Sequence, residues 1–160
     1  MTVKSALRVG LSFGLTSAVI TTLGLMMGLF TSTQSRLAVI GGVLTIALAD
    51  ALSDALGIHV SQESQPEVSV EQVWLATLAT FGAKFGFALT FVLPLVFFPL
   101  STAIRINIVW GLVLLGILSG LVGKKQDGWA WRTMVEHLVI ALAVLLISSQ
   151  VGRLIQKFFS

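Results

Sequence analysis

Residues 48–61, LADALSDALGIHVS, place two aspartates four positions apart in a segment that is otherwise apolar enough to lie in a lipid bilayer. A carboxylate in hydrocarbon is energetically expensive. Such residues therefore usually face the protein interior, a cavity or a partner charge, and they often mark an ion pathway. The fold must provide something for Asp50 and Asp54 to face.

The composition is that of a membrane protein. Of the 160 residues, 56% are hydrophobic and only 11% are charged, whereas soluble domains carry roughly 25% charged residues. The mean hydropathy of +0.97 agrees with this. We therefore expect an all-α integral membrane protein whose surface contacts the lipid bilayer.

The polar residues argue against several functional classes. Most basic residues sit at the ends of apolar runs, where they anchor helices at the membrane interface, so the net charge of +3 does not indicate a nucleic-acid partner. The chain has no cysteine and two histidines, which excludes disulfides and argues against a zinc site built from protein nitrogen. No nucleophile–base set or phosphate-binding loop is present, so we do not expect an enzyme.

Five apolar runs predict five transmembrane helices in one membrane domain, residues 1–160. The first run is long enough to span and lacks a small-x-small cleavage site, which favours a retained helix over a signal peptide. Pro66 is expected to stop the extension of the second helix. Residues 100–107 are expected to form a turn, or alternatively the fourth span starts a few residues before Ile108. The predicted spans are 9–30, 37–60, 74–98, 108–122 and 133–154.

Basic residues in the short loops do not decide the orientation. With the N-terminus inside, the inner side carries five of them and the outer side four, so the positive-inside rule gives almost no preference. The inner residues are Lys4, Arg8, Lys124, Lys125 and Arg132, and the outer residues are Arg36, Arg105, Arg153 and Lys157.

Polarity lies on one side of the second predicted helix. Because each residue advances by about 100°, Asp50 and Asp54 are about 40° apart, and Gly57 and Ser61 lie close to Asp50. The opposite side suits lipid or helix packing and carries Leu48, Leu52 and Leu56. In the first span, hydroxyl groups are expected to bond to their own backbone or a neighbouring helix, or alternatively to line a polar path; they belong to Ser12, Thr16, Ser17, Thr21 and Thr22.

Lys84 is expected at the same depth as Asp50. Each lies about ten residues, or roughly 15 Å, from the inner end of its predicted helix. They could form an ion pair that only neutralises two buried charges. Alternatively, Lys84 could balance the carboxylates until a cation displaces it. Asp54, one turn nearer the inner surface, is expected to be less fully compensated.

Two further pairs of polar residues lie at predicted membrane boundaries. His59 and Glu63 could form a solvated interfacial pair, or they could collect metal ions together with Glu67 and Glu71 in the acidic connection of residues 62–72. Glu136 and His137 are expected to bond the preceding loop or to cap the start of the fifth helix. We do not expect catalysis from them.

The candidate metal ligands centre on the two aspartates. A divalent cation needs more oxygen ligands than one helix supplies, but a twofold homodimer would bring four carboxylates to one axis. Lys84 and Asp50 are candidates for proton or charge coupling, because a carboxylate in a low-dielectric site can also bind a proton. No tightly bound cofactor is expected. The candidate metal ligands are Asp50, Asp54, His59, Ser61 and Glu63.

Several segments of the sequence match the conserved segments of one known protein family. The second span matches the segment ALSxALGEYVSVSSQ, and the first resembles DGLVTTLALVxGL. By these segments the chain resembles the short members of the vacuolar iron transporter family, which lack the cytosolic metal-binding domain, over nearly its whole length. The residues that carry the resemblance are Thr21-Thr22-Leu23, Gly28-Leu29, Ala51-Leu52-Ser53, Ala55-Leu56-Gly57, Val60-Ser61, Ser64-Gln65, Leu93-Pro94-Leu95, Glu136, Leu138-Val139-Ile140 and Gly152-Arg153.

The resemblance implies a five-span homodimer with a pore lined by the first two spans. It implies export of Fe²⁺ or Mn²⁺ from the cytosol in exchange for protons, and a cytosolic N-terminus, here in a prokaryotic cell membrane. The polar positions differ from the family pattern. Ser17 replaces an aspartate, Asp54 a methionine, Ile58 a glutamate, His59 a tyrosine and Asp50 an alanine or glycine. A carboxylate in place of a thioether favours harder ions such as manganese or magnesium.

Two functions from different classes remain open. The first is a dimeric, proton-coupled transporter of divalent cations with Asp50 and Asp54 as ligands or proton carriers. The second is a membrane scaffold or subunit that does not transport and that keeps Asp50, Asp54 and Lys84 as an internal polar network.

Overall fold

The computed structural model describes residues 3–123 and 130–159, and the regular structure in these ranges is entirely helical. Within them, five segments are long and apolar enough to cross a membrane, with α3 and α4 counted together as Val70–Phe97. This confirms the all-α class and the five apolar spans. The helices are α1 (Val3–Thr33), α2 (Arg36–Glu63), α3 (Val70–Thr90), α4 (Val92–Phe97), α5 (Leu100–Gly123) and α6 (Ala130–Phe159).

The helices begin before the predicted spans and, except for the third, end after them, and one predicted boundary is wrong. The sequence predicts a turn over residues 100–107, but α5 begins at Leu100. Its first turn is closed by the amide of Ala103, which donates to the carbonyl of Pro99 at 2.9 Å. The polar residues of this stretch are part of the helix: Arg105 is exposed on it, whereas Asn107 is buried.

Short turns with specific capping residues separate the first three helices. Gln34 adopts a φ of 49°, and Ser35 caps α2 by accepting a hydrogen bond from the amide of Ala38 at 3.3 Å. α2 ends at Glu63, which confirms the predicted stop before Pro66. α3 then begins with a capping box formed by Ser69 and Gln72.

The third span is interrupted near its end. Pro94 has no amide hydrogen and cannot continue the α-helical ladder, and α3 gives way to α4 at Phe91. α5 bonds to the residues at this break with two side chains. Asn107 Nδ2 donates to the carbonyl of Phe91 at 2.8 Å, and Trp110 Nε1 donates to Thr90 Oγ1 at 3.0 Å.

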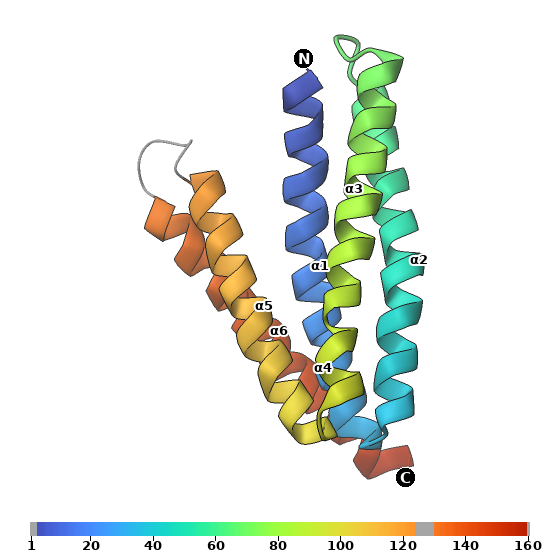
Figure 1. The fold of residues 1–160 in the computed structure, drawn as a ribbon, viewed down its shortest axis with the longest axis vertical. Coiled ribbons are helices and arrows are strands. Elements are labelled where there is room, and N and C mark those ends of the chain that lie inside the picture. The colour runs from blue at the N-terminus through green and yellow to red at the C-terminus, as the bar shows by residue number, and fades with distance from the viewer. Residues whose placement is uncertain (1–2, 124–129, 160) are drawn as a thin grey trace.

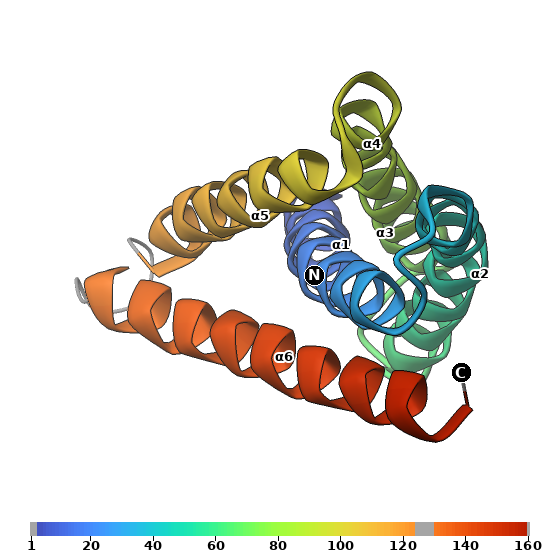
Figure 2. The same cartoon turned by 90° about the horizontal axis from the view of Figure 1, so that it is seen from below.

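α1 is the central helix of the fold. It packs against α2, α3, α5 and α6, and Figure 2 shows it surrounded by them. α1, α2 and α3 run side by side, whereas α5 and α6 lean away from them toward the end where α1 begins (Figure 1). We call this the N-terminal end of the bundle, and the opposite end, where α6 finishes, the C-terminal end. The main apolar core lies around α1 and includes Val19, Leu23, Met26, Leu95 and Leu115.

The exterior of the bundle is apolar on all its long helices. On α2 the three leucines predicted to face outward, Leu48, Leu52 and Leu56, are 51%, 54% and 63% exposed. Such an exterior is that of a membrane protein. Lys124 and Lys125, which enter the orientation argument, lie outside the described residues.

Candidate functional site

A glycine brings α1 against α3 beside the charged residues. A Cβ added at Gly14 would lie 2.7 Å from the carbonyl oxygen of Thr80 and 3.2 Å from Cβ of Ala83. A larger residue would force the helices apart. About one turn further along each helix are Ser17 of α1 and Lys84 of α3, so the close packing places these two side chains opposite each other.

Lys84 is the centre of a charged cluster formed by Ser17, Asp50, Asp54 and Lys84. Its side chain is only 1% exposed, and its Nζ lies 2.6 Å from Asp50 Oδ2. The same ammonium donates to Asp54 Oδ2 and, at 2.8 Å, to Ser17 Oγ. The ammonium thus donates two hydrogen bonds and has a third oxygen, from Asp50, at ion-pair distance. The predicted ion pair between Asp50 and Lys84 is present.

Asp54 is the better bonded carboxylate, contrary to the prediction. Its Oδ2 accepts from Lys84 and also from Ser17 Oγ at 2.6 Å. Asp50 Oδ2 meets Lys84 as an ion pair without hydrogen-bond geometry, and no group in residues 3–123 and 130–159 donates a hydrogen bond to it. The expectation that Asp54 is less compensated than Asp50 is wrong, because Ser17 of α1 reaches Asp54.

The cluster carries excess negative charge when all its groups are ionised. Two carboxylates face one ammonium, and no other salt bridge involves these carboxylates in the part of the chain that the structure describes. The side chains of Asp50 and Asp54 are 26% and 20% exposed. The cluster also lies near the middle of α1, of α2 and of Val70–Phe97. A net charge at this position needs a further cation, a proton or a polar partner on its accessible side.

Ser17 is the member of the cluster that was not among the predicted site residues. Two of its neighbours behave as the first expectation for the hydroxyl groups describes. Ser12 Oγ donates to the carbonyl of Arg8, and Thr21 Oγ1 donates to the carbonyl of Ser17 at 2.9 Å. Ser17 bonds to the neighbouring helices α2 and α3, which the same expectation includes. One signal for this was available, because the family resemblance aligns Ser17 with an aspartate.

The other predicted metal ligands are not brought to the cluster. His59 faces α3, where its Nδ1 is 3.0 Å from Thr77 Oγ1 and its ring meets that of Trp74 edge-on at a centroid distance of 4.7 Å. Ser61 and Glu63 are exposed on α2. Within the described ranges, no three or more His, Asp or Glu side chains lie close enough to hold a metal ion.

The polar pair at the start of α6 bonds neighbouring helical residues. His137 Nδ1 is 2.7 Å from Ser119 Oγ of α5, which links the two leaning helices. Glu136 Oε1 accepts from Arg132 Nε at 3.3 Å, and both of these side chains are exposed. Within the described chain, no hydrogen bond or ion pair links either residue to the charged cluster.

Comparisons of this chain with known protein families, with curated proteins and with solved structures find no match. The function must therefore be argued from the cluster itself and from the motifs of the sequence.

Proposed function

We propose that the protein is an integral membrane transporter of divalent cations and that the charged cluster is its exchange site. Fe²⁺ or Mn²⁺ as substrate, export from the cytosol and exchange for protons follow from the family resemblance. So do a cytosolic N-terminus and a prokaryotic cell membrane. The chain's own residues supply the argument for a cation.

The excess negative charge of the cluster is the observation that carries this proposal. The side chain of Asp50 is partly exposed, and within the described chain its buried Oδ2 is held by the ion pair with Lys84 and by no hydrogen bond. Asp54 also accepts a hydrogen bond from Ser17, so Asp50 is the carboxylate that has fewer bonds to exchange for a cation. Lys84 balances the carboxylates while the site is empty and releases them to the cation. Lys84 and the substrate thus compete for Asp50 and Asp54. The hydrogen bond between Ser17 and Asp54 supports a site here, since the resemblance aligns Ser17 with an aspartate and Asp54 with a methionine of the family.

A homodimer would supply further ligands. α2 exposes a small residue at every fourth position on one side, and such rows let membrane helices approach closely. The row runs directly beside Asp50 and Asp54 on the helix surface. Two copies paired along it would bring four carboxylates toward one interface. The row consists of Gly41, Thr45, Ala49, Ser53, Gly57 and Ser61.

Uptake into proteoliposomes tests the transport function. With a proton gradient across the vesicle membrane, we expect wild-type protein to move Mn²⁺. Asp50→Asn and Asp54→Asn should each slow this movement by about tenfold or more, equal to about 1.4 kcal/mol, because each removes a carboxylate charge from the site.

Glu136→Gln is the matched control, since it makes the same chemical change at an exposed residue outside the cluster, and its rate should stay at the wild-type level. Equal rates for wild type and both Asp→Asn variants would contradict the site assignment.

A non-transporting scaffold is the second candidate. It is favoured by one observation, namely that Lys84 already contacts both carboxylates and Ser17. As a scaffold, the chain would hold α1, α2 and α3 together through this polar network. It would show no metal dependence in any assay, and the uptake experiment separates the two functions.

A further inference from the structure

Two buried side-chain oxygens near the contact between α1 and α5 have no hydrogen-bond partner in residues 3–123 and 130–159. They are Thr22 Oγ1 of α1 and Asn107 Oδ1 of α5. Thr22 is 1% exposed and Asn107 is 0% exposed. A polar atom buried without a partner costs free energy, and in a membrane-spanning bundle bulk water does not satisfy it. The two oxygens therefore indicate a polar ligand inside the bundle.

Both residues belong to the segments through which α5 packs on α1. Asn107 Nδ2 is 3.3 Å from Met26 Sδ, and a Cβ added at Gly111 would lie 2.7 Å from Leu23 Cδ1. Met26 follows Thr22 by one helical turn, and long side chains on a helix run back over the preceding turn. The side chain of Met26 thus connects the surroundings of Thr22 with those of Asn107.

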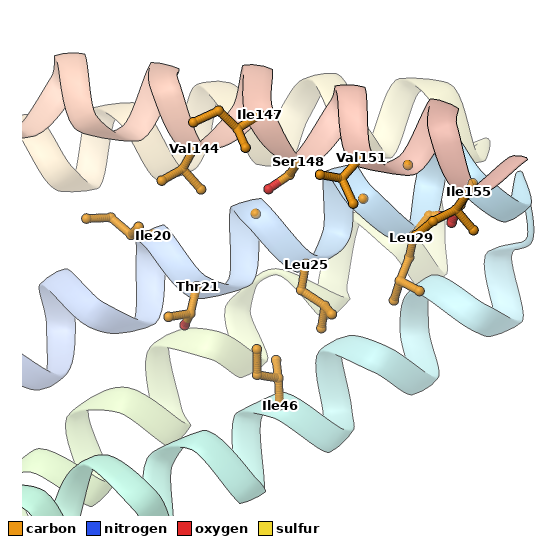
Figure 3. A pocket seen from close by; sticks show the side chains of 14 residues that line it. Ile20, Thr21, Leu25, Leu29, Ile46, Val144, Ile147, Ser148, Val151 and Ile155 are labelled. Carbon is orange, nitrogen blue, oxygen red and sulfur yellow. The ribbon is translucent and has the colours of Figure 1, made fainter. Parts of the chain in front are cut away.

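The hydroxyl of Thr22 differs from those of other threonines in the spans. Thr21, Thr31 and Thr80 each donate to the carbonyl four residues earlier in their own helix, at 2.9, 2.8 and 2.8 Å. Thr22 forms no such bond, so its proton is available to another acceptor. It also lies away from the apolar groove of about 550 Å³ between α1, α2 and α6, which its neighbour Thr21 lines (Figure 3).

The nitrogen of Asn107 fixes the orientation of its amide group. Nδ2 donates to the carbonyl of Phe91 at 2.8 Å and to Met26 Sδ, which uses both of its protons. A flipped amide would place Oδ1 against the carbonyl of Phe91, where two acceptors would face each other. Asn107 Oδ1 is therefore an acceptor that needs a donor, whereas the hydroxyl of Thr22 can donate as well as accept.

We propose that a buried water molecule bridges Thr22 Oγ1 and Asn107 Oδ1. The water donates a hydrogen bond to Asn107 Oδ1 and accepts the hydroxyl proton of Thr22, so both oxygens are satisfied. It lies beside the break between α3 and α4, because Asn107 also bonds the carbonyl of Phe91 there. Ordered water is one of the means by which membrane proteins satisfy polar groups where proline, here Pro94, interrupts a helix. The proposal is independent of cation transport.

NMR cross peaks between protein and water test the site. With the protein in perdeuterated detergent micelles and its threonine methyl groups isotope-labelled, we expect cross peaks to water from the Thr22 methyl group and the Asn107 side-chain amide. Thr80 is the internal control, because it is also fully buried but its hydroxyl bonds the carbonyl of Ala76. Its methyl group should show no such peak. Absence of the peaks at Thr22 and Asn107, or an equal peak at Thr80, would overturn the proposal.

Two matched variants test whether Thr22 holds the water. Thr22→Val keeps the shape of the side chain and should abolish the water peak of Asn107, whereas Thr80→Val should leave it unchanged. A persisting Asn107 peak in Thr22→Val would contradict the bridge. If Thr22→Val does not fold, the wild-type spectra still decide.

Unfolding constants give a second measurement of the same bridge. The effects of Thr22→Val and Asn107→Leu should be coupled by about tenfold in the unfolding constant, whereas those of Thr80→Val and Asn107→Leu should combine independently. Coupling between Thr22 and Asn107 without water peaks would mean a direct hydrogen bond between them, which also overturns the proposal. None of these outcomes bears on the uptake experiment.

Discussion

Replacing Lys84 with methionine is expected to destabilise the protein by about 3–5 kcal/mol, the usual cost of removing one partner of a buried ion pair. Methionine keeps the approximate length of the side chain, so the loss of stability measures the contribution of the ammonium charge. Without the ammonium, Asp54 keeps only its bond from Ser17, and Asp50 keeps no cationic partner that the structure describes. The measurement is the free energy of unfolding in detergent micelles at neutral pH.

Two controls separate charge from packing. Lys4→Met removes an exposed lysine of α1 and should cost less than about 1 kcal/mol. Combining Lys84→Met with Asp50→Asn and Asp54→Asn leaves no unpaired charge, and this triple variant should be more stable than Lys84→Met alone. A cost for Lys84→Met no larger than that of Lys4→Met would mean that the cluster does not hold the three helices together.

Replacing Ser17 with aspartate is expected to raise the affinity for Mn²⁺ by about tenfold or more, which is about 1.4 kcal/mol. Ser17 Oγ is 2.6 Å from Asp54 Oδ2 and 2.8 Å from Lys84 Nζ, so a carboxylate here would be a third acidic ligand beside the first two. Hard divalent cations prefer such all-oxygen sites. Equilibrium dialysis against Mn²⁺ in detergent gives the affinity directly.

Ser12→Asp provides the matched control. It adds the same charge to α1 slightly more than one turn earlier, at a hydroxyl that bonds the carbonyl of Arg8 rather than the cluster. Its affinity should equal that of the wild type. If Ser17→Asp and Ser12→Asp bind Mn²⁺ equally tightly, any gain in affinity comes from the added negative charge in general. Position 17 is then not part of a cation site.

The sequence predicts the helices well because their signals are local. Apolar runs of sufficient length define five spans, and Pro66 marks the end of α2 as expected. The fourth span is the exception. Its polar residues Arg105 and Asn107 suggest a turn, but Arg105 faces outward while Asn107 donates to the carbonyl of Phe91 at the break between α3 and α4. That partner lies on another helix and cannot be seen in the periodicity of α5.

The site is only partly predictable for the same reason. Asp50 and Lys84 lie at matching distances from the inner ends of their helices, and this match predicts their ion pair. The distances follow from the number of residues alone. Which carboxylate is better bonded depends on how α1 rotates against α2 and α3, and this is set by the close approach at Gly14. His59 likewise bonds Thr77 of α3 instead of Glu63 on its own helix. A helical wheel shows which residues share a side, but not which neighbour that side meets.

Competition between Lys84 and the substrate cation is most directly tested by the Mn²⁺ affinities of wild type and Lys84→Met. If both cations use Asp50 and Asp54, removing the ammonium should tighten Mn²⁺ binding by about tenfold or more. Adding Asp54→Asn should reverse this gain, and Mn²⁺ should restore part of the stability that Lys84→Met loses. Weaker binding in Lys84→Met than in the wild type, or no binding in either protein, would contradict the exchange site and leave the scaffold as the function of the cluster.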